Sequence, residues 1–225
     1  MNEHVTGFDR SMARAGALAG IASVLAYFGA AFMPLPDAIS RLLAFAFGPL
    51  LGVSFLGLYH ALASHSDGPA LRFGVALGLL AGCTVTIMLS VQMGNNMIFA
   101  EQLDAADAST TAGQAARDAA MLSHRAVNRV QMLIDVAWDV FICGAGLGIG
   151  AAMLGHPRYR WLFGATGIAA SAALLYLNLD TFPAGPAYAG SVDLGPLLAV
   201  WFLVVFLRVL WLNRSAVPQP RSEVV

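Results

Sequence analysis

The chain has 225 residues, of which 58% are hydrophobic and 11% are charged, and its formal net charge is -1. An average soluble domain is about 25% charged, and a soluble fold could not bury this much apolar surface, so the composition predicts an integral membrane protein. The small net charge gives no reason to expect a nucleic acid or another strongly charged partner. All twelve basic residues are arginine, which excludes a lysine Schiff base and a P-loop lysine.

Six apolar stretches are long enough to cross about 30 Å of hydrocarbon as helices. Turn-forming sequences such as MPLPD and SHSDGP separate them. The predicted spans are roughly residues 14–33, 41–63, 72–99, 130–154, 161–179 and 193–213. The sequence therefore predicts an all-α fold, a six-helix transmembrane bundle built of three helical hairpins. We expect residues 1–214 to form a single transmembrane domain and residues 215–225 a disordered cytoplasmic tail.

Arginine is distributed unequally between the two sides that these spans define. With the N-terminus inside, eight arginines lie in inner segments and four in outer segments, and acidic residues gather outside. Arginine-rich loops tend to stay in the cytoplasm. We therefore expect a multi-pass protein of the bacterial inner (plasma) membrane with both termini cytoplasmic. Three of the four outer arginines belong to the long loop 100–129, where this rule is weaker.

A shift of 147 residues aligns the first two spans with the last two. Residues 20–22 (GIA) fall on residues 167–169, and residues 48–51 (GPLL) fall on residues 195–198. Such an internal repeat is typical of two parallel hairpins related about an axis near the membrane normal. The hairpin of spans three and four is then the odd unit and the candidate for function. Rows of glycines, such as Gly74, Gly78 and Gly82, indicate close helix packing within the bundle.

The loop before the fourth span contains TTAGQAARDAAMLSHRAVNR, which is rich in helix formers, and Thr110 or Thr111 is a candidate N-cap. We expect this segment to form an amphipathic outer helix between spans three and four. Polar residues follow it at helical spacing and share one face of the helix. They are His124, Asn128, Gln131, Asp135 and Asp139.

Further polar residues come to the same outer surface, from Gln92 at the end of the third span to Asn178 near the end of the fifth. A carboxylate near the bilayer centre costs on the order of 2.5–3.5 kcal/mol on insertion scales, so it should face the bundle or water. We predict an outward-opening polar cavity between spans three to six, with apolar walls from Trp138, Trp201, Phe99 and Tyr176. The candidate ligand-binding or cavity residues are Gln92, Asn95, Asn96, Asn128, Gln131, Asp135, Trp138, Asp139 and Asn178.

Three functions stay open on the sequence. The favoured one is a non-enzymatic polytopic protein that binds a small apolar or amphipathic ligand in a sensory or accessory role. The second is a small transporter or channel that uses Asp135 and Asp139. The third is a membrane-embedded, lipid-modifying enzyme. A purely structural role for the acids competes with all three, because such residues often bond only to backbone or interfacial water.

No catalytic residue, metal site or cofactor is predicted. The sequence contains no Ser/His/Asp set at usable spacing, no metal-ligand motif and no nucleotide-binding loop. His60, His65 and His156 are expected at the surface near the cytoplasmic face. The predicted partners are the lipid bilayer and the small ligand, with a second copy of the chain or another membrane subunit as further candidates.

Three stretches resemble an uncharacterised bacterial family of integral membrane proteins with about six spans, described only as a domain of unknown function. They are ARAGALAGIASVLAYFGA, then LIDVAWDVF with the following GHPRYRWLFGATGI, and LNLDTFPAGPAYAGSVDLGPLLAVWF. The resemblance implies a helical bundle of the bacterial inner membrane. It implies no activity and no catalytic residues.

Overall fold

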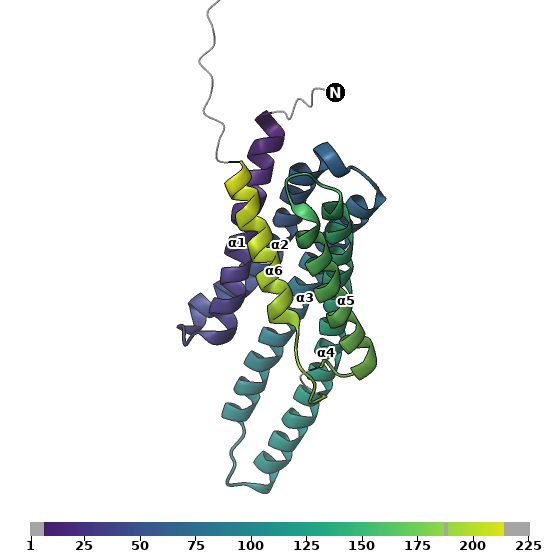
Figure 1. The fold of residues 1–225 in the computed structure, drawn as a ribbon. Helices are drawn as coiled ribbons and strands as arrows, with labels where there is room; N and C mark the ends of the chain where they lie inside the picture. Colours follow the sequence, from purple (N-terminus) through teal and green to yellow (C-terminus); the bar gives the residue numbers. More distant parts are fainter. Residues whose placement is uncertain (1–6, 187–188, 214–225) are drawn as a thin grey trace, which may run out of the picture.

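The computed structural model describes residues 7–186 and 189–213, which form six α-helices packed as a bundle (Figure 1). All six helices are long and apolar enough to cross a membrane. The chain is therefore a polytopic all-α membrane protein, as the sequence predicts. The tail 215–225 lies outside the described residues. The helices are α1 (Gly7–Phe32), α2 (Asp37–Ser66), α3 (Pro69–Ala105), α4 (Thr111–Leu154), α5 (Arg160–Thr181) and α6 (Gly195–Leu212).

Prolines mark several of the helix boundaries. α1 ends just before the PLP sequence of residues 34–36, where the prolines cannot continue the ladder of backbone hydrogen bonds. α3 and α6 each carry a proline in their first turn, Pro69 and Pro196, where a missing N–H costs nothing. Pro49 differs because it lies inside α2.

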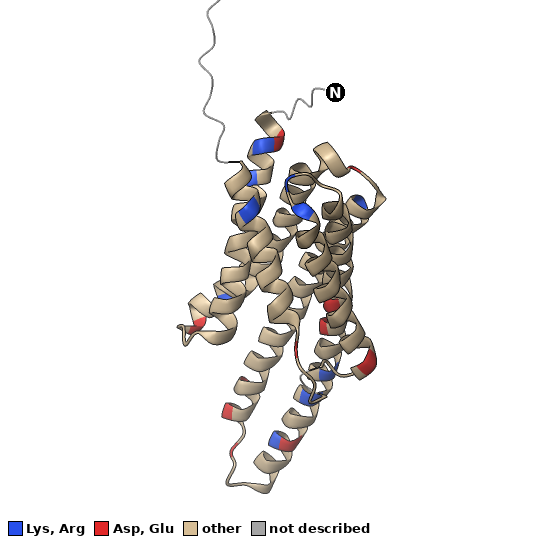
Figure 2. Ribbon diagram, viewed as in Figure 1, with Lys and Arg blue, Asp and Glu red and all other residues tan. Residues whose placement is uncertain are grey.

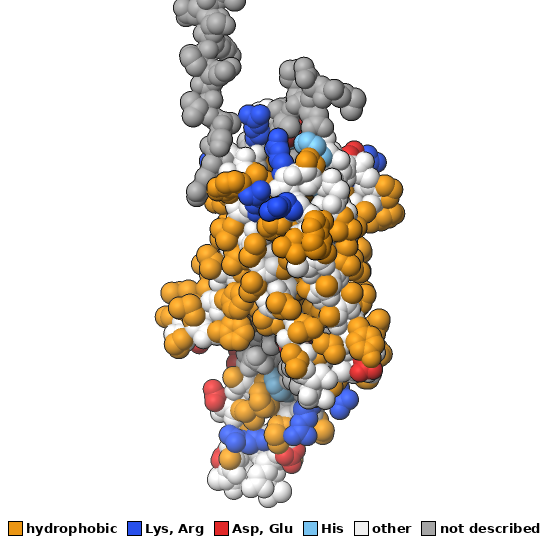
Figure 3. All heavy atoms as spheres, viewed as in Figure 1, with side chains coloured by type: hydrophobic (Ala, Val, Ile, Leu, Met, Phe, Trp, Pro, Cys, Tyr) orange, Lys and Arg blue, Asp and Glu red, His pale blue; other side chains and the backbone are white. Residues whose placement is uncertain are grey.

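Apolar side chains cover the outside of the bundle as well as its interior. Leu42, Phe73 and Trp161 are each more than 65% exposed. Figure 3 shows hydrophobic side chains over the middle of the visible face, with charged side chains toward both ends. A lipid-facing surface explains this distribution, because acyl chains are as apolar as the side chains they contact.

The two ends of the bundle differ in charge (Figure 2). At one end α1 begins and α6 ends; we call it the termini end. The tip of the α3–α4 hairpin projects at the other, which we call the loop end. The described arginines of the termini end are Arg10, Arg14, Arg72, Arg158, Arg160 and Arg208. Acidic residues gather at the loop end, namely Asp37, Glu101, Asp104, Asp107, Asp118, Asp180 and Asp193.

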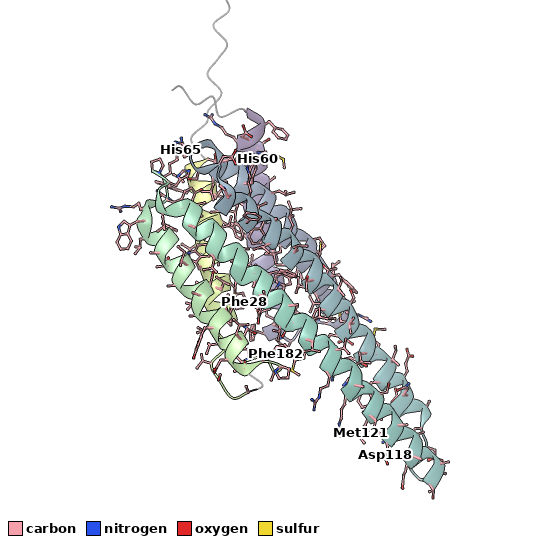
Figure 4. The ribbon with its side chains drawn as sticks, turned by 90° about the vertical axis from the view of Figure 1, so that its right-hand side faces the viewer. Phe28, His60, His65, Asp118, Met121 and Phe182 are labelled. Atoms are coloured by element: carbon pink, nitrogen blue, oxygen red, sulfur yellow. The ribbon has the colours of Figure 1, made fainter. Side chains whose placement is uncertain are left out.

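α3 and α4 are much longer than a membrane is thick. Their 37 and 44 residues correspond to lengths of roughly 56 and 66 Å, so both extend past about 30 Å of hydrocarbon. Figure 4 shows Asp118 and Met121 on the hairpin that projects from the loop end, far from His60 and His65 at the termini end.

No separate amphipathic outer helix lies between spans three and four in the described chain. Residues 111–129 are instead the first part of α4, and α4 packs directly against α3. The physical reason is local, since residues 114–143 contain no glycine or proline that would end the helix. The predicted cap is confirmed at Thr110, whose side-chain oxygen accepts a hydrogen bond from the Gly113 N–H at 3.0 Å.

Glycines set the closest helix contacts. A Cβ atom on Gly16 of α1 would collide with the backbone of Gly57 on α2, and one on Gly74 of α3 would lie about 3 Å from the backbone of Gly148 on α4. The rows of small residues therefore let backbones touch within the bundle, as predicted from their spacing.

The third predicted hairpin packs differently from the other two. α1 packs along α2 and α3 along α4, but α5 packs mainly against α4 and touches α6 little. α6 lies against α1 instead, where Phe206 occupies the space beside Gly20. The internal repeat therefore stays a prediction from the sequence, since its two hairpins differ in packing.

The Gly16–Gly57 contact generates a stability prediction. Gly57→Ala should lower the free energy of unfolding by about 1–3 kcal/mol, because the added methyl group must separate two helix backbones. Gly94→Ala in α3 is the matched control, since no heavy atom lies within 4 Å of a Cβ there. Thermal unfolding in detergent measures both changes. Equal stability of the two variants would contradict this account of α1–α2 packing.

Candidate functional site

A cavity of about 680 Å³ lies in the loop-end half of the bundle. Residues of α1, α2, α3, α4 and α6 line it, together with Asp193 from the connection before α6, whereas α5 contributes only Leu174. Pockets for small organic molecules usually measure about 300–1,000 Å³. The space is therefore of a size that suits a small ligand.

The floor of the cavity, which is its side toward the termini end, is apolar and closed. It consists of buried apolar side chains, including Leu51, Val85, Leu174, Leu198 and Phe202. Each is at most 4% exposed. A molecule that enters from the loop end would thus meet hydrophobic surface at the bottom of the cavity, which favours an apolar group there.

The part of the cavity wall nearer the loop end, here called the upper wall, carries a group of three carboxylates. Asp135 and Asp139 lie one turn apart on α4 and both line the cavity. Asp193 lies close enough for its charge to act on both of them. Tyr27 of α1 lies within reach of the charges of all three. Asp135 and Asp139 therefore face the interior of the bundle and not lipid, as the cost of a lipid-facing carboxylate requires.

Six of the nine candidate residues from the sequence lie on the cavity wall. They are Gln92, Asn96, Gln131, Asp135, Trp138 and Asp139. Whether they bind a ligand stays a prediction.

Asn95 and Asn128 hold the α3–α4 hairpin together instead of lining the cavity. The Asn95 side-chain amide donates to the Asn128 side-chain oxygen at 2.8 Å and to the His124 carbonyl at 3.1 Å. The ring of Phe99 stacks on His124 with 4.2 Å between centroids. The polar face of α4 thus has two roles, because its first part bonds to α3 and its later part lines the cavity.

Asn178 lies just behind the wall. It is fully buried, its side-chain amide donates to the Leu174 carbonyl at 3.1 Å, and it lies beside Asp139. Its side-chain oxygen accepts no hydrogen bond from the described residues. Because a buried amide is costly to leave unpaired, Asn178 belongs to the polar surroundings of Asp139 although it does not line the cavity.

The predicted position between spans three to six is wrong in one respect. α5 adds only Leu174 to the wall, because α4 and α5 pack closely together; a Cβ on Gly146 of α4 would collide with the Ser171 side chain of α5. α1 and α2 form the opposite wall, with Tyr27 and Phe47 among its side chains. This wall was not predicted from the sequence, where Tyr27 within an apolar span was the available signal.

Of the four aromatic residues expected as apolar walls, only Trp138 lines the cavity. The Trp201 indole donates to the Phe163 carbonyl at 3.1 Å, and Tyr176 is 66% exposed on the outside of α5. Trp138 packs edge-on against Phe47, with 6.2 Å between ring centroids. These two rings form an aromatic section of the wall that joins α2 to α4.

A single arginine stands at the mouth of the cavity. Arg41 on α2 is exposed, donates from Nε to the Asp37 carbonyl at 3.3 Å, and reaches the sulfur of Met97 on α3 at 3.8 Å. Arg41 is the only basic residue among the described lining residues. Because Arg41 makes these contacts at the mouth, it does not pair with the carboxylates deeper in the cavity.

The histidines of the termini end form a different group. His60 pairs with Asp9 at 2.8 Å, and the rings of His65 and His156 lie 4.7 Å apart. The expectation of a surface position is wrong for His156, which is only 2% exposed. Among the described residues, no group of three or more His, Cys, Asp or Glu side chains is placed to hold a metal ion.

Comparisons with protein-family models, with curated proteins and with solved structures found no match. The fold and the six spans define the class, a polytopic helical membrane protein. No family is identified, so the resemblance of three stretches to a bacterial membrane family stays a prediction.

His156 makes the stability of the termini end depend on pH. Burial, with the charges of His65 and Arg158, lowers its pKa from 6.5 to about 4. Its stabilising contribution is therefore complete above the unfolded pKa of 6.5 and is lost as the pH falls toward 4. Acidification from about pH 7.5 to 5 should cost about 2 kcal/mol at this residue.

The His156→Gln variant should lose less stability than the wild type over this pH range, because glutamine takes up no proton on unfolding. Thermal unfolding in detergent at a series of pH values measures the difference. Parallel curves for the two proteins would show that His156 does not titrate as described.

Proposed function

We propose that this protein is a non-enzymatic, polytopic membrane protein whose cavity binds a small amphipathic molecule, in a sensory or accessory role. One observation carries the proposal, namely that a cavity of about 680 Å³ combines a closed apolar floor with a polar upper wall. Ligand sites are typically concave and mostly apolar, with a few polar groups that fix the orientation of the ligand.

The arginine distribution supports an orientation for this site. More of the described arginines lie at the termini end than at the loop end, and short arginine-rich segments favour the cytoplasm. In a bacterial inner membrane both termini would then be cytoplasmic, and the cavity would open toward the periplasm. The projecting α3–α4 hairpin would stand beside its mouth.

The geometry favours binding over transport. A transport path needs a second opening, but the buried floor separates the cavity from the termini end. The described pocket at that end, beside His60 and Tyr159, has a volume of about 10 Å³, which is room for about one water molecule. The described lining residues include Ser40 and four acids but no histidine or cysteine, so neither a Ser–His nor a Cys–His pair lines the cavity.

A cavity-filling substitution tests the proposal. Ala44 of α2 lines the cavity, so Ala44→Trp should abolish binding of added decyl amphiphiles because the indole occupies the space. Val53→Trp is the matched control, since Val53 lies on the same helix and is 44% exposed on the outside of the bundle. Native mass spectrometry of protein released from lipid nanodiscs measures the bound molecules. Equal occupancy in both variants would contradict a binding function for this cavity.

A further inference from the structure

We infer that the ligand of this cavity is an amphipathic organic cation, which is a molecule with an apolar body and a positively charged amine. This inference rests on the proposed function and names the chemical class of its ligand. Charge balance, the depth of the polar groups and the aromatic wall support it.

The charge of the wall is unbalanced. Four aspartates line the cavity, Asp37, Asp135, Asp139 and Asp193, against the one basic side chain of Arg41. Arg41 stays at the rim, in contact with the Asp37 carbonyl and the Met97 sulfur. Within the described chain, none of the ion pairs involves Asp135, Asp139 or Asp193. Asp135 and Asp139 are half-buried and Asp193 is exposed, so a cationic ligand would supply a counter-charge that these carboxylates lack among the described side chains.

Three of these acids lie near one another in the cavity wall. Asp135 and Asp139 project from successive turns of α4. Asp193 is fixed nearby because its Oδ1 accepts a hydrogen bond from the Gly195 N–H at 2.8 Å, at the start of α6. Their charges act on one another, so the electrostatic attraction of all three would act on a cationic group near this part of the wall.

The surfaces around the three acids match the alkyl part and the ammonium group of an amphipathic cation. Around the acids much of the lining is buried and apolar, with Leu198 and Phe202 at 2% and 3% exposure. Beside them lie the aromatic rings of Tyr27, Phe47 and Trp138. Aromatic faces attract alkylammonium groups, most strongly where water is excluded. The alkyl part would therefore lie on the floor, with the ammonium group at the level of the acids.

Other ligand charges fit less well. An anion would face three carboxylates with only the rim arginine to balance them, and like charges brought together in a site of low dielectric repel strongly. A neutral molecule would leave the carboxylates unpaired behind it, at the cost of their desolvation. A metal ion lacks a set of three suitable ligands among the described residues.

Three molecules with the same alkyl chain test the inference on the full-length wild-type protein in nanodiscs. They are decyltrimethylammonium, decanol and decyl sulfate, compared by native mass spectrometry. The wild type should bind the cation at least about tenfold more tightly than the alcohol, and the sulfate more weakly than either. Equal affinity for the cation and the alcohol would overturn the inference but leave the proposed function intact.

Charge removal provides the second arm. The double variant Asp135→Asn/Asp139→Asn keeps the shape of both side chains and should bind the cation about tenfold more weakly, with decanol affinity within about twofold of the wild type. The control is Asp118→Asn/Asp180→Asn, which removes two exposed loop-end charges away from the cavity wall and should leave both affinities unchanged.

The outcomes separate the two proposals. Undiminished cation binding by Asp135→Asn/Asp139→Asn overturns the inference, because the cation then does not lie between these acids. If this variant loses affinity for decanol as well, the inference is tested by the wild type alone, through its relative affinities for the cation, the alcohol and the sulfate. If Ala44→Trp displaces none of them, the proposed function itself fails.

Discussion

Asp135 and Asp139 lie on a transmembrane helix, where a carboxylate facing acyl chains costs on the order of 2.5–3.5 kcal/mol on insertion scales. This cost fixes the rotation of α4 about its axis. With the acids turned inward, the glycines of the later part of α4 meet α3 and α5, and the earlier part presents Asn128 to α3. The polar interior and the close contacts of α4 with α3 and α5 both depend on this one orientation.

The same helix determines where the bundle is solid and where it is open. Near the termini end, Gly148 meets Gly74 and Gly150 meets Gly164, so backbones touch and no space remains. Toward the loop end, the residues of α4 that line the cavity carry larger side chains, among them Gln131, Trp138 and Asp139. The change in side-chain size along this one helix therefore accompanies a cavity that is closed toward the termini end and open toward the loop end.

The sequence was sufficient for the features that depend on one helix at a time. Six apolar runs predict six spans, and the four-residue spacing from Asp135 to Asp139 places both acids on one face. Features that depend on how helices pack were out of reach. The α1–α2 wall with Tyr27 and the burial of His156 follow from helix positions that hydrophobicity alone does not set. The continuity of α4 through residues 111–129 is the exception, because the absence of glycine and proline from residues 114–143 is visible in the sequence.

The central claim is that the acids of α4 face a water-accessible cavity rather than lipid, and thiol labelling tests it most directly. Asp139→Cys and Val140→Cys would be compared in nanodiscs, with Cys83 and Cys143 replaced by serine. Val140 is adjacent and 38% exposed on the outside of the bundle. A charged, water-soluble methanethiosulfonate should modify Cys at 139 and leave Cys at 140 unmodified. Modification at 140 with none at 139 would contradict the account.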